Sequence, residues 1–149
     1  GTLVTDVDLS EMRQTYALRL ELAQLVGTLD PVPADDATMR RLGELERTAA
    51  RLAAAPAARP FARLNMAHFA LGLTLTANAP LRDVSERLYY RTARIWLKSI
   101  PRMDLAAEIA HFRAEMAETR TALAAGDLQA AALVRRAHLS MSFTRLNAF

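Results

Sequence analysis

The histidines and their acidic neighbours are the first side chains to weigh for chemistry. Glu108 and His111 match the Glu-x-x-His spacing of di-iron helical bundles, in which two such motifs and two further Glu converge on the metals. The sequence holds one copy of this motif. Glu108 and Glu115 flank His111 at helical spacing, which predicts that His111 belongs to a charged, solvated helix face. A helical metalloenzyme using Glu108 and His111 is therefore only the third of three hypotheses.

Other catalytic patterns are absent from the sequence. The chain contains no cysteine, which excludes a disulfide, a thiolate metal site and a thiol nucleophile. It also holds no Gly-rich phosphate loop, no Gly-x-Ser-x-Gly turn and no His-Glu-x-x-His motif. We predict that the protein is not an enzyme.

An arginine on an apolar stripe is a better candidate for binding. Arg19 shares one helical face with Met12, Tyr16 and Ala23, and no acidic residue lies three or four positions from it. Such an arginine meets an anion, or it reaches water along its aliphatic stem, or it pairs with a carboxylate from another helix. The residue pattern leaves these alternatives open.

Two further polar positions interrupt apolar helix faces. Asn65 and His68 lie beside Phe69 on about one third of a helical turn, and a polar pair inside an apolar stripe needs partners. His138 stands near Ser142 at the edge of the last apolar stripe. An isolated histidine in such a place is more often hydrogen-bonded than a ligand.

The elements that must position these residues are predicted to be helices. Ala and Leu dominate the sequence, 52% of the residues are hydrophobic, and strand-favouring β-branched residues are sparse. The 149 residues fit one domain, and we expect an all-α antiparallel bundle of six to seven helices. The six expected helices run from about Leu9 to Leu25, from Asp36 to Ala55, from after Pro60 to before Asn78, from Leu81 to Ser99, from after Asp104 to Ala125, and from Asp127 to near the C-terminus.

Acidic residues and one glycine mark the expected helix ends. Asp8, Asp104 and Asp127 precede apolar periodic segments, as N-cap residues do. Gly126 suits the position that follows a helix and precedes the next N-cap.

The charge and hydropathy patterns limit where in the cell the protein is expected and which partners it is expected to bind. No apolar run approaches the roughly 20 residues that span a bilayer, and the N-terminus lacks a signal-peptide pattern. The formal net charge is +3, but the basic residues, all Arg except Lys98, are scattered singly or in pairs. We expect a soluble cytoplasmic protein with no membrane partner and no dense basic patch.

Three short segments, in this order, carry a resemblance to a known family. Residues 8–21, with Tyr16 and Arg19, are similar to its opening helix, and the turn at 78–81 is similar to its Asn-Pro-Leu turn. The segment 122–139, with Gly126-Asp127 and Ala137-His138-Leu139, is similar to its closing pair of helices. Together they resemble the FCD domain, the C-terminal effector domain of FadR-type GntR transcription regulators, over nearly the whole chain.

The resemblance implies a division of the chain and a function. Residues 1–5 are expected to be a remnant of the wing and linker of a winged helix, because Gly1-Thr2-Leu3-Val4 is similar to the end of that wing. Residues 6–149 are expected to form an effector-binding and dimerisation domain. The implied protein is a homodimer that senses a small effector, such as an organic acid. Operator DNA is then a partner only through the winged-helix domain that this chain lacks.

The resemblance also implies where a metal would lie. Many FCD domains hold a divalent metal with one Asp and three His, and those positions fall on Asn65, Phe69, Met116 and His138. Only His138 keeps its ligand type, and divalent metals prefer charged oxygen or imidazole nitrogen. We therefore predict that the metal site is lost and that no cofactor is used. A shifted register, in which Asn65, His68 and His138 converge, is the alternative.

The leading hypothesis is a metal-free effector pocket in which Arg19 contacts an anion. The other residues expected to bind the effector are Tyr16, Asn65, Phe69, Met116, His138 and Ser142. The second hypothesis is a purely structural dimerisation bundle whose pocket is closed by Phe69 and Met116. A cavity beside Arg19 favours the first hypothesis, and a filled core favours the second.

Overall fold

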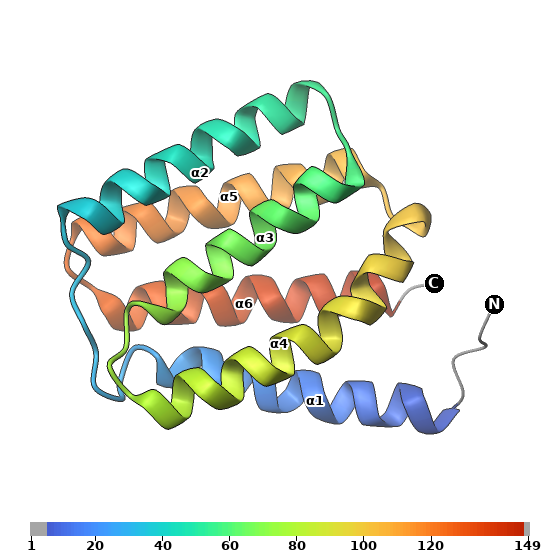
Figure 1. The fold of residues 1–149 in the computed structure, drawn as a ribbon, viewed down its shortest axis with the longest axis horizontal. Helices are drawn as coiled ribbons and strands as arrows, with labels where there is room; N and C mark the ends of the chain where they lie inside the picture. The colour runs from blue at the N-terminus through green and yellow to red at the C-terminus, as the bar shows by residue number, and fades with distance from the viewer. Residues whose placement is uncertain (1–5, 148–149) are drawn as a thin grey trace.

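The computed structural model describes residues 6–147 and confirms the expected all-α bundle (Figure 1). The predicted wing and linker remnant at residues 1–5 lies outside the described residues. Within 6–147 there are six α-helices, one short 3-10 helix and no β-strand. The elements are α1 (Asp6–Leu25), α2 (Asp36–Ala54), α3 (Ala58–Leu73), α4 (Ala79–Ser99), η1 (Ile100–Arg102), α5 (Leu105–Ala124) and α6 (Leu128–Leu146).

The helices pack side by side in an order that differs from their order in the chain. Helix α6 lies between α5 and α1, α2 lies against α5, α3 lies against α2, and α4 lies against α1. The bundle thus curves from α3 through α2, α5, α6 and α1 to α4, with neighbours running antiparallel (Figure 1). Side chains from α1, α3, α4, α5 and α6 therefore meet inside the curve.

Two of the predicted N-cap residues are found at the start of their helices. The Asp104 carboxylate accepts a hydrogen bond from the Ala107 amide at 3.1 Å, and the Asp127 carboxylate accepts one from the Ala130 amide at 2.9 Å. Gly126 has a φ of 73°, the left-handed conformation that favours glycine after a helix. The predicted turn between α5 and α6 is confirmed.

Three predicted helix boundaries were wrong. Helix α1 begins at Asp6, so Asp8 lies inside the helix and is not its N-cap. Helix α3 includes Pro60 in its first turn, where proline is tolerated because the first amides have no partner within the helix. Helix α3 also ends at Leu73, and Asn78 is the N-cap of α4 rather than the stop signal of α3.

Two loops at one end of the bundle are joined by hydrogen bonds. The Val32 amide donates to the Leu75 carbonyl, and the Ala77 amide donates to the Asp30 carbonyl, both at 2.8 Å. Asn78 also donates from its side chain to the Asp30 carboxylate at 3.0 Å. These bonds fix the connection after α1 against the connection after α3, and thereby set where α4 starts.

The buried apolar residues form two clusters. The larger one joins α2, α3 and α5 and includes Leu42, Ile109 and Met116, which are fully buried. The smaller one joins α1 and α6 and is built on Tyr16 and Leu139. Buried polar side chains also occur in the bundle, among them those of Arg19, His68, Thr92, Glu108 and Glu115.

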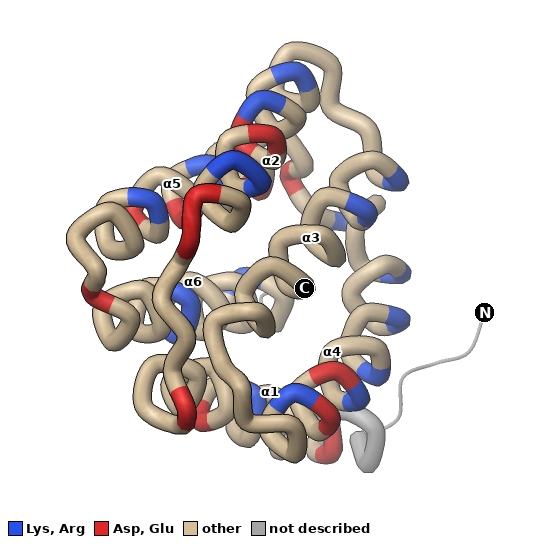
Figure 2. The backbone as a smooth tube through the Cα atoms, turned by 60° about the vertical axis from the view of Figure 1, so that its left-hand side comes forward, with Lys and Arg blue, Asp and Glu red and all other residues tan. Residues whose placement is uncertain are grey.

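Basic residues that appear scattered in the sequence lie on one exposed face of α4. Arg87, Arg91, Arg94 and Lys98 are exposed and follow one another at intervals of four, three and four residues. Figure 2 shows basic positions recurring along this helix. Helical spacing thus gathers into one row basic residues that are apart in the sequence, and one of them, Arg91, is paired with Glu11 of α1.

Candidate functional site

Arg19 is a buried cation without a carboxylate partner among the side chains of residues 10–147. It is 7% exposed, and its Nη1 donates a hydrogen bond to the Thr92 hydroxyl at 2.9 Å. The guanidinium carbon lies 5.2 Å from the ring centre of Tyr16 and 5.4 Å from that of Tyr89. Burial lowers the pKa of Arg19 to about 10, so the side chain stays protonated at neutral pH.

The groups around this guanidinium are themselves fixed. The ring of Tyr16 stacks on Phe143 of α6 at a centroid distance of 4.3 Å, and the ring of Tyr89 stacks on Phe69 of α3 at 4.1 Å. The Thr92 hydroxyl, which accepts from the guanidinium, donates its own proton to backbone carbonyls one turn earlier in α4. The cation is thus held in one place before any ligand arrives, which lowers the cost of binding an anion.

The other buried charges on the inner face of the bundle are paired. Arg145 binds the Glu108 carboxylate through two nitrogens at 2.7 and 3.0 Å, and Arg135 contacts both oxygens of Glu115 at 3.1 and 3.2 Å. Glu108 and Glu115 are 8% and 3% exposed. Their predicted place on a solvated charged face was wrong, because arginines of α6 cover that face of α5. His111 itself is exposed, as predicted.

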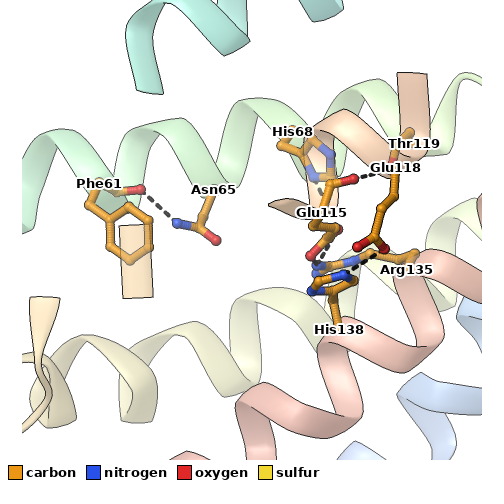
Figure 3. A network of polar contacts seen from close by, with 8 residues as sticks. All are labelled: Phe61, Asn65, His68, Glu115, Glu118, Thr119, Arg135 and His138. Atoms are coloured by element: carbon orange, nitrogen blue, oxygen red, sulfur yellow. Dashed lines mark hydrogen bonds and ion pairs between the residues drawn. The ribbon is translucent and has the colours of Figure 1, made fainter. Parts of the chain in front are cut away.

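His68 is a buried and neutral histidine in contact with one of these pairs. Its Nδ1 lies 3.8 Å from a carboxylate oxygen of Glu115 (Figure 3). Its ring also meets that of Phe112 edge-on, at a centroid distance of 4.9 Å. Burial lowers the pKa of His68 to about 4, and the attraction of Glu115 offsets this only in part. The imidazole therefore adds no charge to the site at neutral pH.

Two other polar residues that the sequence singles out have partners close by. Asn65 donates from its amide to the Phe61 carbonyl one turn earlier, at 2.8 Å. The Nε2 of His138 lies 2.9 Å from the Glu118 carboxylate on the neighbouring helix (Figure 3). His138 is thus a hydrogen-bonded histidine at the edge of the apolar stripe.

Two cavities meet at Arg19. The first has a volume of about 70 Å³ and a wall of mixed polar and apolar side chains, the polar ones including Thr92, Glu108 and His138. The second has a volume of about 80 Å³ and a mostly apolar wall from α1, α3, α5 and α6 and the connections beside them, to which α4 adds Ser85. Arg19, Arg135 and Leu139 line both. The cation therefore stands where a cavity of mixed polarity and an apolar cavity adjoin.

The structure brings most of the predicted site residues to these walls. The first cavity is lined by Tyr16, Arg19, Asn65, His138 and Ser142. The second is lined by Arg19 and Phe69. Met116 lines neither, because it is fully buried in the larger apolar cluster.

Sequence reasoning missed Tyr89, Thr92, Glu115 and Arg135. For Glu115 and Arg135 a signal existed, since buried charges on facing antiparallel helices come in opposite-sign pairs. For Tyr89 and Thr92 no signal existed, because their role depends on which face of α4 meets α1.

The residues at the positions that the resemblance assigns to a metal do not fit a divalent ion. Asn65 is engaged by a backbone carbonyl, Phe69 and Met116 offer no anionic or imidazole donor, and His138 is alone. The alternative set of Asn65, His68 and His138 does not converge either. His68 contacts Glu115 and His138 contacts Glu118, so the two imidazoles face different partners. Among the described residues no three His, Asp or Glu side chains converge to hold a metal.

No helix within residues 6–147 is both long and apolar enough to cross a membrane. Comparison of the chain with models of protein families, with curated proteins and with solved structures returned no match. The function is therefore inferred from the site and from the sequence segments described above.

Proposed function

We propose that this chain is the effector-sensing and dimerisation domain of a bacterial transcription regulator of the GntR type, FadR branch. In this proposal it binds a small organic acid without a metal, and binding changes the operator affinity of a winged-helix domain elsewhere in the protein. The observation that carries the ligand part is the uncompensated charge of Arg19 beside two cavities. The assignment to this class of regulator is supported by the segments at 8–21, 78–81 and 122–139.

An organic acid suits this arginine for physical reasons. A planar carboxylate accepts two parallel hydrogen bonds from a guanidinium, and such bonds are about twice as strong as neutral ones. Arg19 uses one nitrogen for Thr92 and faces both cavities, so it has donors left for a ligand. A buried cation without a counterion is costly, and an anion from outside removes that cost.

Thermal unfolding against a panel of organic acids in the presence of a chelator tests the ligand part. A ligand at 100 times its Kd adds about 2.7 kcal/mol of stability, which raises Tm by several degrees. We expect this shift with at least one acid, and we expect it to vanish in Arg19→Gln. Arg94→Gln is the matched control, since it removes the same charge from an exposed position on α4. If no acid shifts Tm, the purely structural dimerisation bundle becomes the better hypothesis.

The dimerisation part is supported by an apolar face on two adjoining helices. Leu18 of α1 and Leu133 and Met141 of α6 are about half exposed. Helices α1 and α6 pack side by side, and in this proposal a second copy covers these side chains through a two-fold symmetric contact. Sedimentation or light scattering is expected to give twice the mass of the chain, and Leu133→Glu with Met141→Glu is expected to halve it. A monomeric parent protein contradicts this part of the proposal.

A further inference from the structure

We infer that the ligand is a short-chain aliphatic monocarboxylate, whose carboxylate binds Arg19 and whose hydrocarbon chain fills the second, apolar cavity. This inference rests on the proposed function and names the class of acid. Four features of the site carry it: the number of uncompensated charges, the apolar wall, a helical glycine that leaves the cavity open, and a buried serine hydroxyl without a partner.

The charges of the site limit the ligand to one negative charge. Arg135 and Arg145 also line the first cavity, but each is bound to its own buried glutamate. His68 is neutral because burial lowers its pKa to about 4. One positive charge, that of Arg19, remains without a counterion among the described residues. A dicarboxylate or a phosphate would therefore bring a second negative charge with no partner.

The lining and the volume of the second cavity determine the length and the polarity of the ligand's hydrocarbon chain. Leu22, Val26, Leu71, Leu123 and Leu128 line it, together with further apolar residues. Its volume of about 80 Å³ is roughly half that of a cavity of about 150 Å³ that holds benzene, so it accommodates on the order of three to four carbon atoms. Most of the several hydroxyl groups of a sugar acid would lose water there without finding a partner, because most of the wall is apolar.

Gly72 leaves space in this cavity. It lies in α3 and lines the cavity, and a Cβ atom at this position would meet no atom within 4 Å. Its φ is not in the left-handed region, so the local backbone does not require glycine. Glycine inside a helix is less stable than alanine, and no packing contact in the structure explains it here. Its absent side chain is what keeps the wall open.

Ser85 provides a second, independent sign of a ligand. Ser85 is 7% exposed and lines the same cavity, and its Oγ is a buried polar atom without a hydrogen-bond partner. Buried hydroxyls normally have a partner. The cavity thus accepts a plain hydrocarbon chain or one that carries a single hydroxyl group to meet Ser85.

Four acids of graded length and polarity test the inference. We would titrate the protein with acetate, butyrate, 4-hydroxybutyrate and succinate and follow the Arg19 side-chain resonances by NMR. Butyrate and 4-hydroxybutyrate are expected to bind at least about tenfold more tightly than succinate, because succinate buries an unpaired carboxylate. Acetate is expected to bind Arg19 weakly, since it does not reach into the apolar cavity.

The variant Gly72→Leu distinguishes the monocarboxylate inference from the proposed organic-acid site at Arg19. Gly72→Ala, which adds a smaller side chain at the same position, is the control. Leucine fills the cavity, so butyrate affinity is expected to fall about tenfold or more while acetate affinity is unchanged. If succinate binds as well as butyrate, or if Gly72→Leu leaves butyrate binding intact, the monocarboxylate inference is overturned and the organic-acid site at Arg19 stands. If none of the four acids binds the parent protein, the inference fails, and the wider panel of organic acids then decides the proposed function. Should Gly72→Leu fail to fold, the comparison of butyrate with succinate on the parent protein decides alone.

Discussion

The Arg19 guanidinium and the Thr92 hydroxyl, 73 residues apart in the chain, are joined by a 2.9 Å hydrogen bond where the two cavities meet. This bond links α1 to α4, the helix at the open end of the curved bundle. Arg19 therefore has two roles. Its hydrogen bond to Thr92 stabilises the packing of α1 against α4, and its buried charge, which has no counterion among the described residues, is available to an anionic ligand.

The first prediction concerns Thr92. Thr92→Val keeps the shape of the side chain but removes the acceptor, so a buried guanidinium nitrogen loses its partner. We expect the free energy of unfolding in urea to fall by about 2 kcal/mol, the usual cost for a hydrogen bond to a charged group. Thr144→Val is the control, because its hydroxyl also binds a carbonyl one turn back but is exposed. Equal effects of the two substitutions would show that the bond to Arg19 does not matter for stability.

The second prediction concerns the buried ion pair between α5 and α6. Glu115→Gln leaves Arg135 without its counterion, and we expect a loss of about 3 kcal/mol in the free energy of unfolding. The double variant Glu115→Leu with Arg135→Met removes both charges and is expected to recover most of that loss. For comparison, Arg41→Met breaks an exposed pair with Glu44 and is expected to cost below about 1 kcal/mol. A double variant no more stable than Glu115→Gln would contradict the argument.

The helices could be predicted from the sequence because their signals are local. The N-caps Asp104 and Asp127 and the glycine at 126 act within one helical turn, and periodicity marks the rest. Two of the three boundaries that failed, at Asp8 and Pro60, are positions where the first turn tolerates more than one residue type. Local rules thus locate helices better than they locate helix ends.

The site could be predicted only in part, because its decisive contacts are tertiary. The missing acidic neighbour of Arg19 is visible in the spacing of α1, whereas Thr92 and Tyr89 become partners only when α4 docks. Glu115 looked solvated because acidic residues on a helix usually are, and its burial depends on Arg135 from α6. Met116 shares a helix face with the core rather than with the cavity. A one-dimensional pattern does not distinguish these two inner surfaces.

The third prediction is a pH dependence of stability caused by His68. Its pKa is about 4 in the folded protein and about 6.5 when unfolded, so between these values the unfolded chain binds more protons. Its contribution is therefore fully present above pH 6.5 and is lost as the pH falls toward 4. The loss amounts to about 3 kcal/mol.

Urea unfolding of the parent protein and of His68→Gln between pH 4 and pH 7 measures this contribution. The difference between the two free energies is expected to shrink or reverse as the pH falls, while the exposed His111→Gln follows the parent curve. NMR titration of the His68 ring is expected to show a midpoint near pH 4. A His68 resonance that titrates near 6.5 would contradict the prediction.

The fourth prediction is that replacing glycine by alanine lowers the stability of the protein at position 27 but not at position 72. A Cβ atom on Gly27 would lie 2.9 Å from backbone atoms of both Gln129 and Leu128, so glycine there lets the end of α1 approach the start of α6. Backbone atoms cannot move aside cheaply, and Gly27→Ala is expected to destabilise the protein by about 1–3 kcal/mol. Gly72→Ala meets no atom and lies in a helix, so it is expected to be neutral or to stabilise by up to about 1 kcal/mol. Thermal unfolding of both variants without ligand measures the contrast. Destabilisation by Gly72→Ala as large as that by Gly27→Ala would mean that α3 packs tightly at this point, and the apolar cavity would then be closed in solution.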